Sequence, residues 1–332
     1  MLELINNKPE IYRIYVPLPQ NPLKNLNSYI VKTDDRNLII DTGFNRSECL
    51  EALLDGLKEL NIDMNKTDIF LTHLHSDHVG LVNKIITENS KIYMGRVDYE
   101  FLSLSLKGVN WSKAEKRFEE EGFPKEIALR LQESNQARKF APEKLFEAIL
   151  LEDGEDFTIG NLKFNVIYTP GHTPGHMCLY MKNEKILFSG DHILFDITPN
   201  ITSWIGVEDS LKNYLNSLEK IKKFKIEKTL PGHRGEYNEV YTRIDDIIKH
   251  HHERLNDILT ILKEQNKEMS AYEIAPFMKW NLRGKPWSEF PDNQKWFAMG
   301  ETLSHLDYLL NAKKIKRYKS GTEQVFKYVV IK

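Results

Sequence analysis

The densest group of reactive side chains lies at residues 73–78, which read His-Leu-His-Ser-Asp-His. Side chains two positions apart on an extended chain point to the same side, so His73 and His75 can bind one metal ion together. Asp77 and His78 begin the helix predicted to follow, and its first turn directs them toward a second ion nearby. Imidazole and carboxylate groups at this spacing are typical of a metal site.

Three later segments place a histidine or an aspartate directly after a glycine, each where a predicted strand ends. They are Gly171-His172, Gly190-Asp191 and Gly232-His233. A single residue of this kind is more often a hydrogen-bonded cap than a ligand. Four such segments in one chain favour a metal site, in which the carboxylate of Asp191 can bridge two cations.

Short strands and amphipathic helices must position these residues, because the hydrophobic period changes repeatedly along the chain. The alternation of strand and helix indicates an α/β or α+β fold. Residues 98–145 read as wholly helical and are predicted to form an insertion. The expected strands lie in 11–16, 28–33, 38–41, 69–72, 157–169, 176–181, 185–189 and 228–230, and the expected helices in 47–60, 79–86, 210–224 and 238–265.

The order of the predicted helices and strands changes after a break at residues 266–269. Ser270 and Glu273 have the spacing of a capping box, which predicts the start of a helix. A second helix is expected over 295–310, and two strands flank a turn at 320–322. The order helix, helix, β-ribbon is typical of a winged-helix module. We therefore place a boundary near residue 266, between a domain of 1–265 and one of 266–332.

The amino-acid composition and the net charge of the chain disfavour several classes of function. The 332 residues include 46 Lys and Arg against 48 Asp and Glu, so no overall basic charge attracts nucleic acid or an anionic membrane. The N-terminus does not read as a signal peptide, and no apolar run approaches the ~20 residues that a membrane-spanning helix requires. With Cys49 and Cys178 as the only cysteines, no disulfide framework is expected, which predicts a cytoplasmic protein.

The four-part histidine and aspartate pattern resembles the metallo-β-lactamase superfamily over about residues 10–250. The resemblance implies an α+β fold, a four-layer αββα sandwich of two mixed sheets, with the helical insertion 98–145 as a lid. The C-terminal module resembles the extension of a lactamase-like subgroup that includes single-strand ribonucleases. The implied ligands are His73, His75 and His172 for one metal ion, Asp77, His78 and His233 for a second, and Asp191 as the bridge between them.

Differences between this sequence and the site residues of particular branches of the family disfavour some activities. The commonest true β-lactamases carry Cys at the position of Asp191 and Arg at that of His78, which disfavours antibiotic hydrolysis. Diiron flavoprotein oxidases carry Glu at the position of His75 and have a flavodoxin domain, which disfavours oxygen reduction. The sequence then resembles glyoxalase II, acyl-homoserine lactonases and related thioester or ester hydrolases.

The resemblance implies a binuclear, metal-dependent hydrolase. Two divalent ions that share a hydroxide lower its pKa toward neutrality, so no serine or cysteine nucleophile is required. We expect the catalytic residue Asp77 to orient this hydroxide and to pass a proton to the leaving group. Zinc is the expected metal, with iron or manganese as alternatives, because imidazole and carboxylate ligands suit all three.

Further residues lie near the expected ligands in sequence. His176 and His192 are predicted either to support the ligands or the substrate, or to make structural hydrogen bonds. Phe195 and Trp204 belong to an apolar stretch that suits an acyl or aryl substrate, although packing beneath the insertion explains it equally well. The remaining histidines are interpreted as structural, with 250–252 on a solvated or partly packed helix face.

Three functions remain open. The leading one is hydrolysis of a thioester, ester or lactone of a small molecule. The second is a metal-dependent single-strand endoribonuclease that holds RNA through the wing, and the third is a non-enzymatic DNA-binding ligand sensor. The insertion and the wing are also candidate contact surfaces for a homodimer. The basic residues in and before the wing are Lys313, Lys314, Lys316, Arg317 and Lys319.

Overall fold

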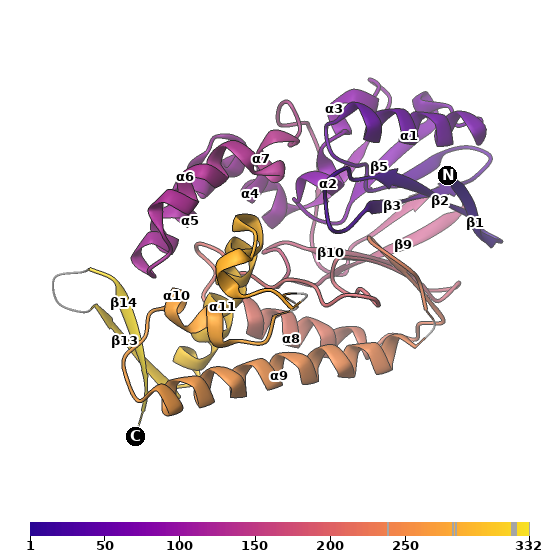
Figure 1. The fold of residues 1–332 in the computed structure, drawn as a ribbon. Coiled ribbons are helices and arrows are strands. Elements are labelled where there is room, and N and C mark those ends of the chain that lie inside the picture. Colours follow the sequence, from indigo (N-terminus) through magenta and orange to yellow (C-terminus); the bar gives the residue numbers. More distant parts are fainter. Residues whose placement is uncertain (238, 281, 283, 320–323, 332) are drawn as a thin grey trace.

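Two mixed β-sheets pack face to face, and helices cover the outer face of each sheet (Figure 1). The computed structural model describes residues 1–332 except 238, 281, 283, 320–323 and 332. The predicted four-layer αββα sandwich is therefore confirmed. The first helical layer is α1 (Ser47–Glu59), α2 (Ser76–Val79) and α3 (Val82–Ile85), and the second is α8 (Ser210–Ile221) and α9 (Val240–Gln265).

The first sheet has seven strands in the order of the sequence. Its first four strands are antiparallel, and the later strands add in parallel, with α1 to α3 in the connections. The bounds are β1 (Leu2–Asn7), β2 (Glu10–Pro17), β3 (Asn25–Lys32), β4 (Asn37–Ile40), β5 (Thr67–Leu71), β6 (Ile92–Gly95) and β7 (Ile149–Leu151), and a 3-10 turn, η1 (Met64–Lys66), precedes β5. The strands β1, β6 and β7 were not predicted.

The second sheet has five strands in the order β12-β11-β10-β9-β8. All neighbours are antiparallel except β11 and β12, which are parallel and joined through α8. This parallel pair places the ends of both strands at the same edge of the sheet. The bounds are β8 (Asp156–Ile159), β9 (Leu162–Tyr168), β10 (Met177–Met181), β11 (Ile186–Gly190) and β12 (Lys228–Pro231).

Apolar side chains fill the space between the two sheets and the space beneath α1. Phe70, Phe164 and Phe188 are buried between the sheets. On the other face of the first sheet, α1 packs closely because of Gly56. A Cβ atom at this position would lie only 2.6 Å from Cδ1 of Ile14, so a larger residue would push the helix away from the sheet.

Both cysteines are buried free thiols. The thiol of Cys49 in α1 donates to the carbonyl of Pro17, 2.9 Å away, in the cluster beneath the first helical layer. Cys178 in β10 belongs to the cluster between the second sheet and its helices. Burial raises the pKa of Cys49 to about 11 and that of Cys178 to about 12.

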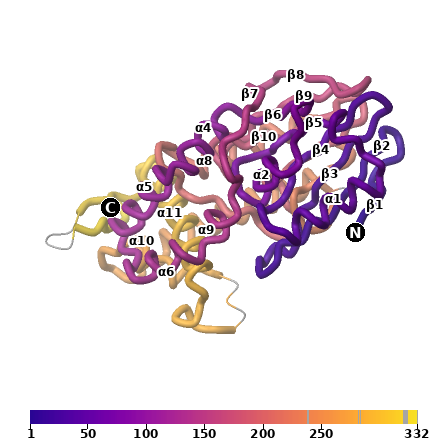
Figure 2. Tube along the Cα trace, turned by 90° about the horizontal axis from the view of Figure 1, so that it is seen from above, coloured from indigo at the N-terminus to yellow at the C-terminus, as the bar shows by residue number. Residues whose placement is uncertain are grey.

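The helical stretch predicted over 98–145 contains four helices that connect β6 to β7. They extend from the sandwich and lie beside the C-terminal helices in both views (Figures 1 and 2). No helix of the described residues is both long and apolar enough to cross a membrane. The four helices are α4 (Arg96–Leu106), α5 (Val109–Glu120), α6 (Lys125–Ser134) and α7 (Gln136–Lys139).

The C-terminal residues follow the predicted order of helix, helix and β-ribbon. The break falls where α9 ends, at Gln265, and the capping box of Ser270 and Glu273 is present. The predicted turn at 320–322 lies outside the described residues, and identity with a winged helix stays a prediction. The elements are α10 (Ala271–Ile274), the 3-10 turns η2 (Ala275–Phe277) and η3 (Trp287–Glu289), α11 (Asp292–Asn311), β13 (Ile315–Lys319) and β14 (Phe326–Val330).

The buried side chains of the C-terminal residues join the core of the second helical layer. Leu303 and Tyr328 belong to the same hydrophobic cluster as Ile258 of α9 and Phe118 of α5. Charged groups add a second connection, because the buried carboxylate of Glu121 accepts from Tyr328 at 2.8 Å and pairs with arginines of both segments. The insertion, α9 and the C-terminal elements thus form one packed unit.

Candidate metal centre

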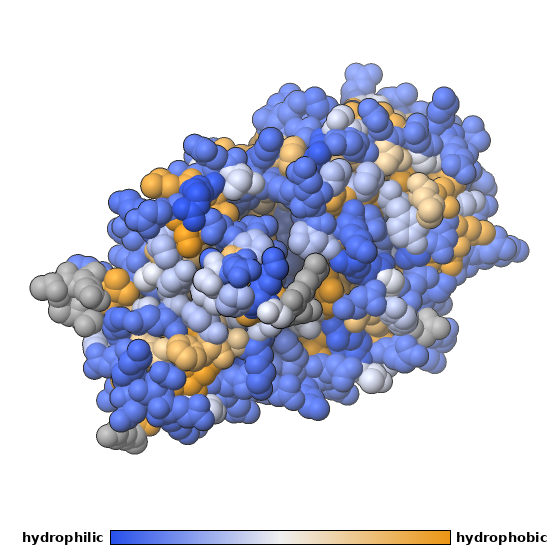
Figure 3. Space-filling model, in the orientation of Figure 1, coloured by the Kyte–Doolittle hydropathy of each residue, from blue (hydrophilic) through white to orange (hydrophobic). Residues whose placement is uncertain are grey.

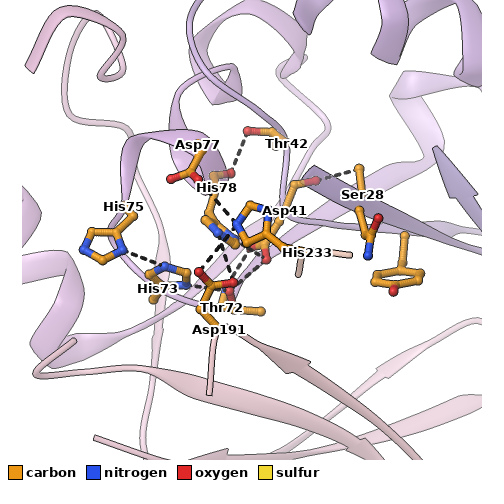
Figure 4. Close-up of polar contacts among 12 residues, drawn as sticks. Ser28, Asp41, Thr42, Thr72, His73, His75, Asp77, His78, Asp191 and His233 are labelled. Carbon is orange, nitrogen blue, oxygen red and sulfur yellow. Dashed lines mark hydrogen bonds and ion pairs between the residues drawn. The ribbon is translucent and has the colours of Figure 1, made fainter. Parts of the chain in front are cut away.

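Four loops bring the seven predicted ligands together at one edge of the sandwich, and Figure 4 shows six of them. The first loop follows β5 and continues into α2, whose N-cap residue is His75. The second connects β9 to β10 and carries His172. Because β11 and β12 are parallel neighbours, the loops that leave their ends emerge side by side and carry Asp191 and His233.

Three histidines form the first group of ligand-type atoms. Nδ1 of His75 lies 3.0 Å from Nε2 of His73 and 3.1 Å from Nε2 of His172. Two nitrogens that bind one tetrahedral zinc ion at ~2.0–2.1 Å are about 3.3 Å apart. The spacing of these nitrogens therefore fits a shared cation.

Asp191 contacts both groups of ligand-type atoms. In the second group, Nε2 of His233 lies 3.4 Å from Oδ2 of Asp77 and 3.5 Å from Oδ2 of Asp191. The other oxygen of Asp191 lies 3.6 Å from Nε2 of His78. Its Oδ2 also lies 3.6 Å from Nε2 of His172, which belongs to the first group. This placement is what a carboxylate that bridges two cations requires.

Buried polar atoms without partners indicate that a cation belongs between these side chains. Within the part of the chain that the structure describes, Nε2 of His78, Nε2 of His233 and Oδ1 of Asp191 are buried and make no hydrogen bond. Leaving such atoms unsatisfied is costly, and a bound divalent ion would satisfy them. His75 is half-buried, so the group is reached from solvent on one side. Figure 3 shows a hollow near the centre of the face of the molecule that is drawn there.

The electrostatics of the site keep the first group in the form that binds metal. Burial lowers the pKa of His75 to about 3, and it also lowers the pKa of His73 and His172, so these rings stay neutral. Metal ligation requires neutral imidazoles and ionised carboxylates.

In the second group, burial opposes protonation of His78 and His233 too, but the neighbouring carboxylates raise the pKa of both rings, so a metal ion would displace a proton there. Burial opposes ionisation of Asp77, but the neighbouring imidazoles of His78 and His233 hold its pKa at about 2.

A second layer of acceptors fixes the orientation of the histidine rings. Asp41 lies 2.7 Å from Nδ1 of His78 and also accepts from the backbone and hydroxyl of Thr72. Nδ1 of His172 lies 2.9 Å from the carbonyl of Asn200, and Nδ1 of His233 lies 2.8 Å from the carbonyl of Asn25. Donation from each Nδ1 leaves Nε2 free for a metal. Asp41 was not predicted to support the ligands, although it is the last residue of the predicted strand 38–41.

Asp98, in the first turn of α4, joins two of the ligand loops. Its carboxylate accepts from the backbone N–H of Leu74 at 2.9 Å, the hydroxyl of Thr173 at 2.6 Å and the backbone N–H of Gly175 at 2.5 Å. Asp98 is fully buried. It thereby fixes the distance between the loop of His73 and the loop of His172. The sequence placed Asp98 at the start of the insertion and gave no signal for this role.

We expect Asp98→Ala to lower the free energy of unfolding by about 3 kcal/mol, because two buried backbone N–H groups lose their acceptor at ~1–3 kcal/mol each. Urea unfolding followed by circular dichroism measures the change. Asp156→Ala is the control, since Asp156 is a surface residue paired with Lys163. A loss of less than about 1 kcal/mol would show that the carboxylate does not hold the loops together.

The pH dependence of stability gives a separate test of the same residue. Burial raises the pKa of Asp98 to about 7, against about 4 in an unfolded chain. Between these values the folded chain binds the proton more tightly, so the stability contributed by Asp98 falls as the pH rises from about 4 to about 7. The difference in unfolding free energy between the wild type and Asp98→Ala should be larger at pH 5 than at pH 8. Equal differences at both pH values would contradict the titration.

The two histidines next to the ligands differ in their contacts. Nε2 of His176 accepts from the backbone N–H of Asp191 at 3.2 Å, and its Nδ1 lies 2.9 Å from the hydroxyl of Thr169. His176 therefore supports the bridging residue. His192 is fully buried against Tyr214, with ring centroids 5.2 Å apart, and neither ring nitrogen has a partner among the described residues.

Trp204 lies against the first group of histidines. Its ring stacks on His75 with centroids 6.0 Å apart, and its Nε1 donates to the carbonyl of His172 at 2.9 Å. Phe101 of α4 packs edge-on against the same indole ring. Phe195 instead packs on the core of the second helical layer and against Tyr237. Trp204 is thus a wall of the site, whereas Phe195 has a packing role.

The histidines of α9 lie in a separate buried cluster. His251 is fully buried, with Nδ1 3.1 Å from Nε2 of His305, while His252 is exposed. His250, His251 and Glu301 are close enough to hold a cation. Nε of Arg254, however, lies 2.9 Å from Nε2 of His250 and 3.0 Å from Glu301. The guanidinium supplies the positive charge that a metal ion would bring.

The basic residues of the ribbon are partly neutralised by the insertion. Arg317 pairs with Glu121 at 3.2 Å, and Lys319 pairs with Glu120 at 3.5 Å. The side chains of Lys313, Lys314 and Lys316 are exposed. The surface available to a nucleic-acid backbone is therefore smaller than the sequence indicates.

Comparisons with known proteins show which family the chain is similar to. Residues 22–233 match the family described as "Metallo-beta-lactamase superfamily". A Drosophila melanogaster protein named "Beta-lactamase-like protein 2 homolog" is 27% identical over 314 residues, which cover 92% of this chain and 89% of that protein. An Aspergillus fumigatus protein named "Atrochrysone carboxyl ACP thioesterase" is 27% identical over 263 residues, or 78% of this chain and 67% of that protein.

A solved structure extends the similarity to nearly the whole chain. The crystal structure of a metallo-beta-lactamase family protein from Thermus thermophilus is similar over 97% of this chain and 98% of its own, with a TM-score of 0.79 and 27% identity. The similarity thus includes the C-terminal elements as well as the sandwich.

Proposed function

The chain belongs to the metallo-beta-lactamase superfamily, and we propose from this premise that it uses two divalent metal ions to hydrolyse a thioester, ester or lactone of a small molecule. The main evidence for this proposal is the position of Asp191. Its carboxylate lies within 3.6 Å of His172 in one group and of His78 in the other. A site for a single ion would not need a carboxylate shared between two sets of ligands.

The seven proposed ligands divide into two groups of three and one residue between them. We assign His73, His75 and His172 to one ion and Asp77, His78 and His233 to the other, with Asp191 between them. Two such ions supply Lewis acidity and lower the pKa of water to near neutrality. Zinc fits the histidine-rich first group, and iron and manganese are the alternatives.

Asp77 is proposed as the residue that moves the proton. Asp77 is 8% exposed, and its Oδ2 lies 3.4 Å from Nε2 of His233 in the second group. Its pKa of about 2 keeps it ionised at neutral pH, which allows it to accept a hydrogen bond from the attacking water and to orient it. The proton can then pass to the leaving group.

The walls of the site favour an acyl substrate over a nucleic acid. Trp204 and Phe101 form an apolar side next to His75, which suits an acyl or aryl group. Salt bridges to the insertion engage two of the basic ribbon residues, Arg317 and Lys319. The Aspergillus relative named as a thioesterase supports the same substrate class.

A hydrolysis panel on protein of measured metal content tests the proposal. The panel contains acyl thioesters, lactones, aryl esters and single-stranded RNA, each assayed before and after removal and restoration of zinc. We expect thioester, ester or lactone hydrolysis that follows the metal content. Hydrolysis of RNA alone, with a steep decrease as salt rises, would establish the ribonuclease instead. Binding of duplex DNA with no hydrolysis would establish the sensor.

A further inference from the structure

Asn200 connects a proposed metal ligand to the C-terminal helix α11. Its backbone carbonyl accepts from Nδ1 of His172 at 2.9 Å. Its side-chain amide donates to Oε2 of Glu301 at 2.9 Å and to the carbonyl of Phe297 at 3.3 Å. The residue that orients the ligand ring is therefore attached by its own side chain to an element outside the sandwich.

The attachment point on α11 is itself held firmly. Glu301 is 7% exposed, and its carboxylate lies 3.0 Å from Nε of Arg254 in α9. The guanidinium of Arg254 lies 4.2 Å from the ring centre of Trp280 and donates to the carbonyl of Lys279 at 3.2 Å. A buried, hydrogen-bonded ion pair of this kind allows little movement, because either partner alone would be an uncompensated buried charge.

From these contacts we infer that Asn200 and Glu301 are positioning residues of the metal centre. Glu301 holds the Asn200 amide, the Asn200 carbonyl then holds Nδ1 of His172, and Nε2 of His172 points toward His75 and Asp191. The inference depends on the proposed function, because it assumes that His172 is a metal ligand. Partners of this type fix the ring orientation and the tautomer of ligating histidines.

The test variant is Asn200→Ala, which removes the amide and keeps the backbone carbonyl. Asn200, Arg254 and Glu301 line a pocket of about 170 Å³, so water can enter the space left by the amide and the chain should still fold. Without the amide, the carbonyl no longer holds His172 in one orientation. We expect zinc bound at the first group to be about tenfold weaker, measured by competition with a chromophoric chelator. The visible absorption band of the cobalt(II) form should shift.

Asn311→Ala is a matched control. Its amide also lies at the contact between α11 and the segment after β11, where it donates to Asp209 at 3.3 Å, and among the described residues it makes no hydrogen bond with His172 or Asn200. This variant should bind zinc as the wild type does. Glu301→Gln keeps an acceptor for the Asn200 amide and should recover most of the affinity that Glu301→Ala loses.

The outcomes separate this inference from the proposed function. Wild-type affinity and an unchanged cobalt spectrum in Asn200→Ala would overturn the positioning role and leave the metal centre intact. Equal weakening in Asn200→Ala and Asn311→Ala would also overturn it, since both effects would then come from loosening of α11. A wild-type chain that binds none of zinc, cobalt, iron and manganese would instead contradict the proposed function.

Discussion

Asp191→Ala should lower hydrolysis by about a hundred- to a thousandfold and reduce the bound metal from two ions per chain to one. The carboxylate is the residue that approaches both groups of ligands, at 3.6 Å from His78 and from His172. Without it, the second group keeps only one aspartate, Asp77, to balance a divalent charge. Elemental analysis of the purified variant gives the metal content, and far-UV circular dichroism shows whether the sandwich is folded.

Asp196→Ala is the control for this variant. Asp196 lies in the same segment and accepts from the backbone N–H of Gly235 at 3.0 Å and from the hydroxyl of Tyr237 at 2.9 Å. It therefore contacts the loop of His233 without facing the ligands. Two ions per chain in Asp191→Ala would contradict the bridging assignment, whereas normal metal content in Asp196→Ala would show that the segment as a whole is intact.

A chain that ends at Gln265 should fail to reach the native fold. The residues removed include Leu303, Leu306, Leu309 and Tyr328, which are at most 3% exposed in the core of the second helical layer. Burial of each such side chain is worth ~1.5–3 kcal/mol, and their sum approaches the whole stability of a typical domain, ~5–15 kcal/mol. Near-UV circular dichroism and urea unfolding of the truncated and complete chains measure the effect.

Removal of only the last two residues is the matched control for the truncation. Ile331 is 37% exposed, so its loss should leave the unfolding transition unchanged. Cooperative unfolding and a native near-UV spectrum for residues 1–265 would contradict the shared core. That result would support an independent domain at 266–332, a division that stays a prediction from sequence.

The sandwich and the position of the ligands could be predicted because local patterns encode them. His73 directly follows one predicted strand. His172 likewise lies in a turn at the end of another predicted strand. The topology of an αββα sandwich then brings such ends to one edge. The helical insertion was also predictable, since its amphipathic pattern contains no strand signal.

The residues that support the ligands could not be found in the same way. Asp98 accepts from the backbone of Leu74, 24 positions before it, and of Gly175, 77 positions after it. Such a contact depends on how α4 leaves β6, which no local pattern records. Arg254 is a similar case, because its pairing with Glu301 depends on the packing of α9 against α11.

The two buried thiols offer a way to follow the two halves of the molecule separately. Cys49 lies beneath α1, and Cys178 lies beneath the second helical layer. A thiol reagent can modify either residue only while its surroundings are transiently open, since both are buried and their thiols resist ionisation. The labelling rates of the two sites, separated by mass spectrometry, therefore report how often each helical layer detaches from its sheet in the native protein.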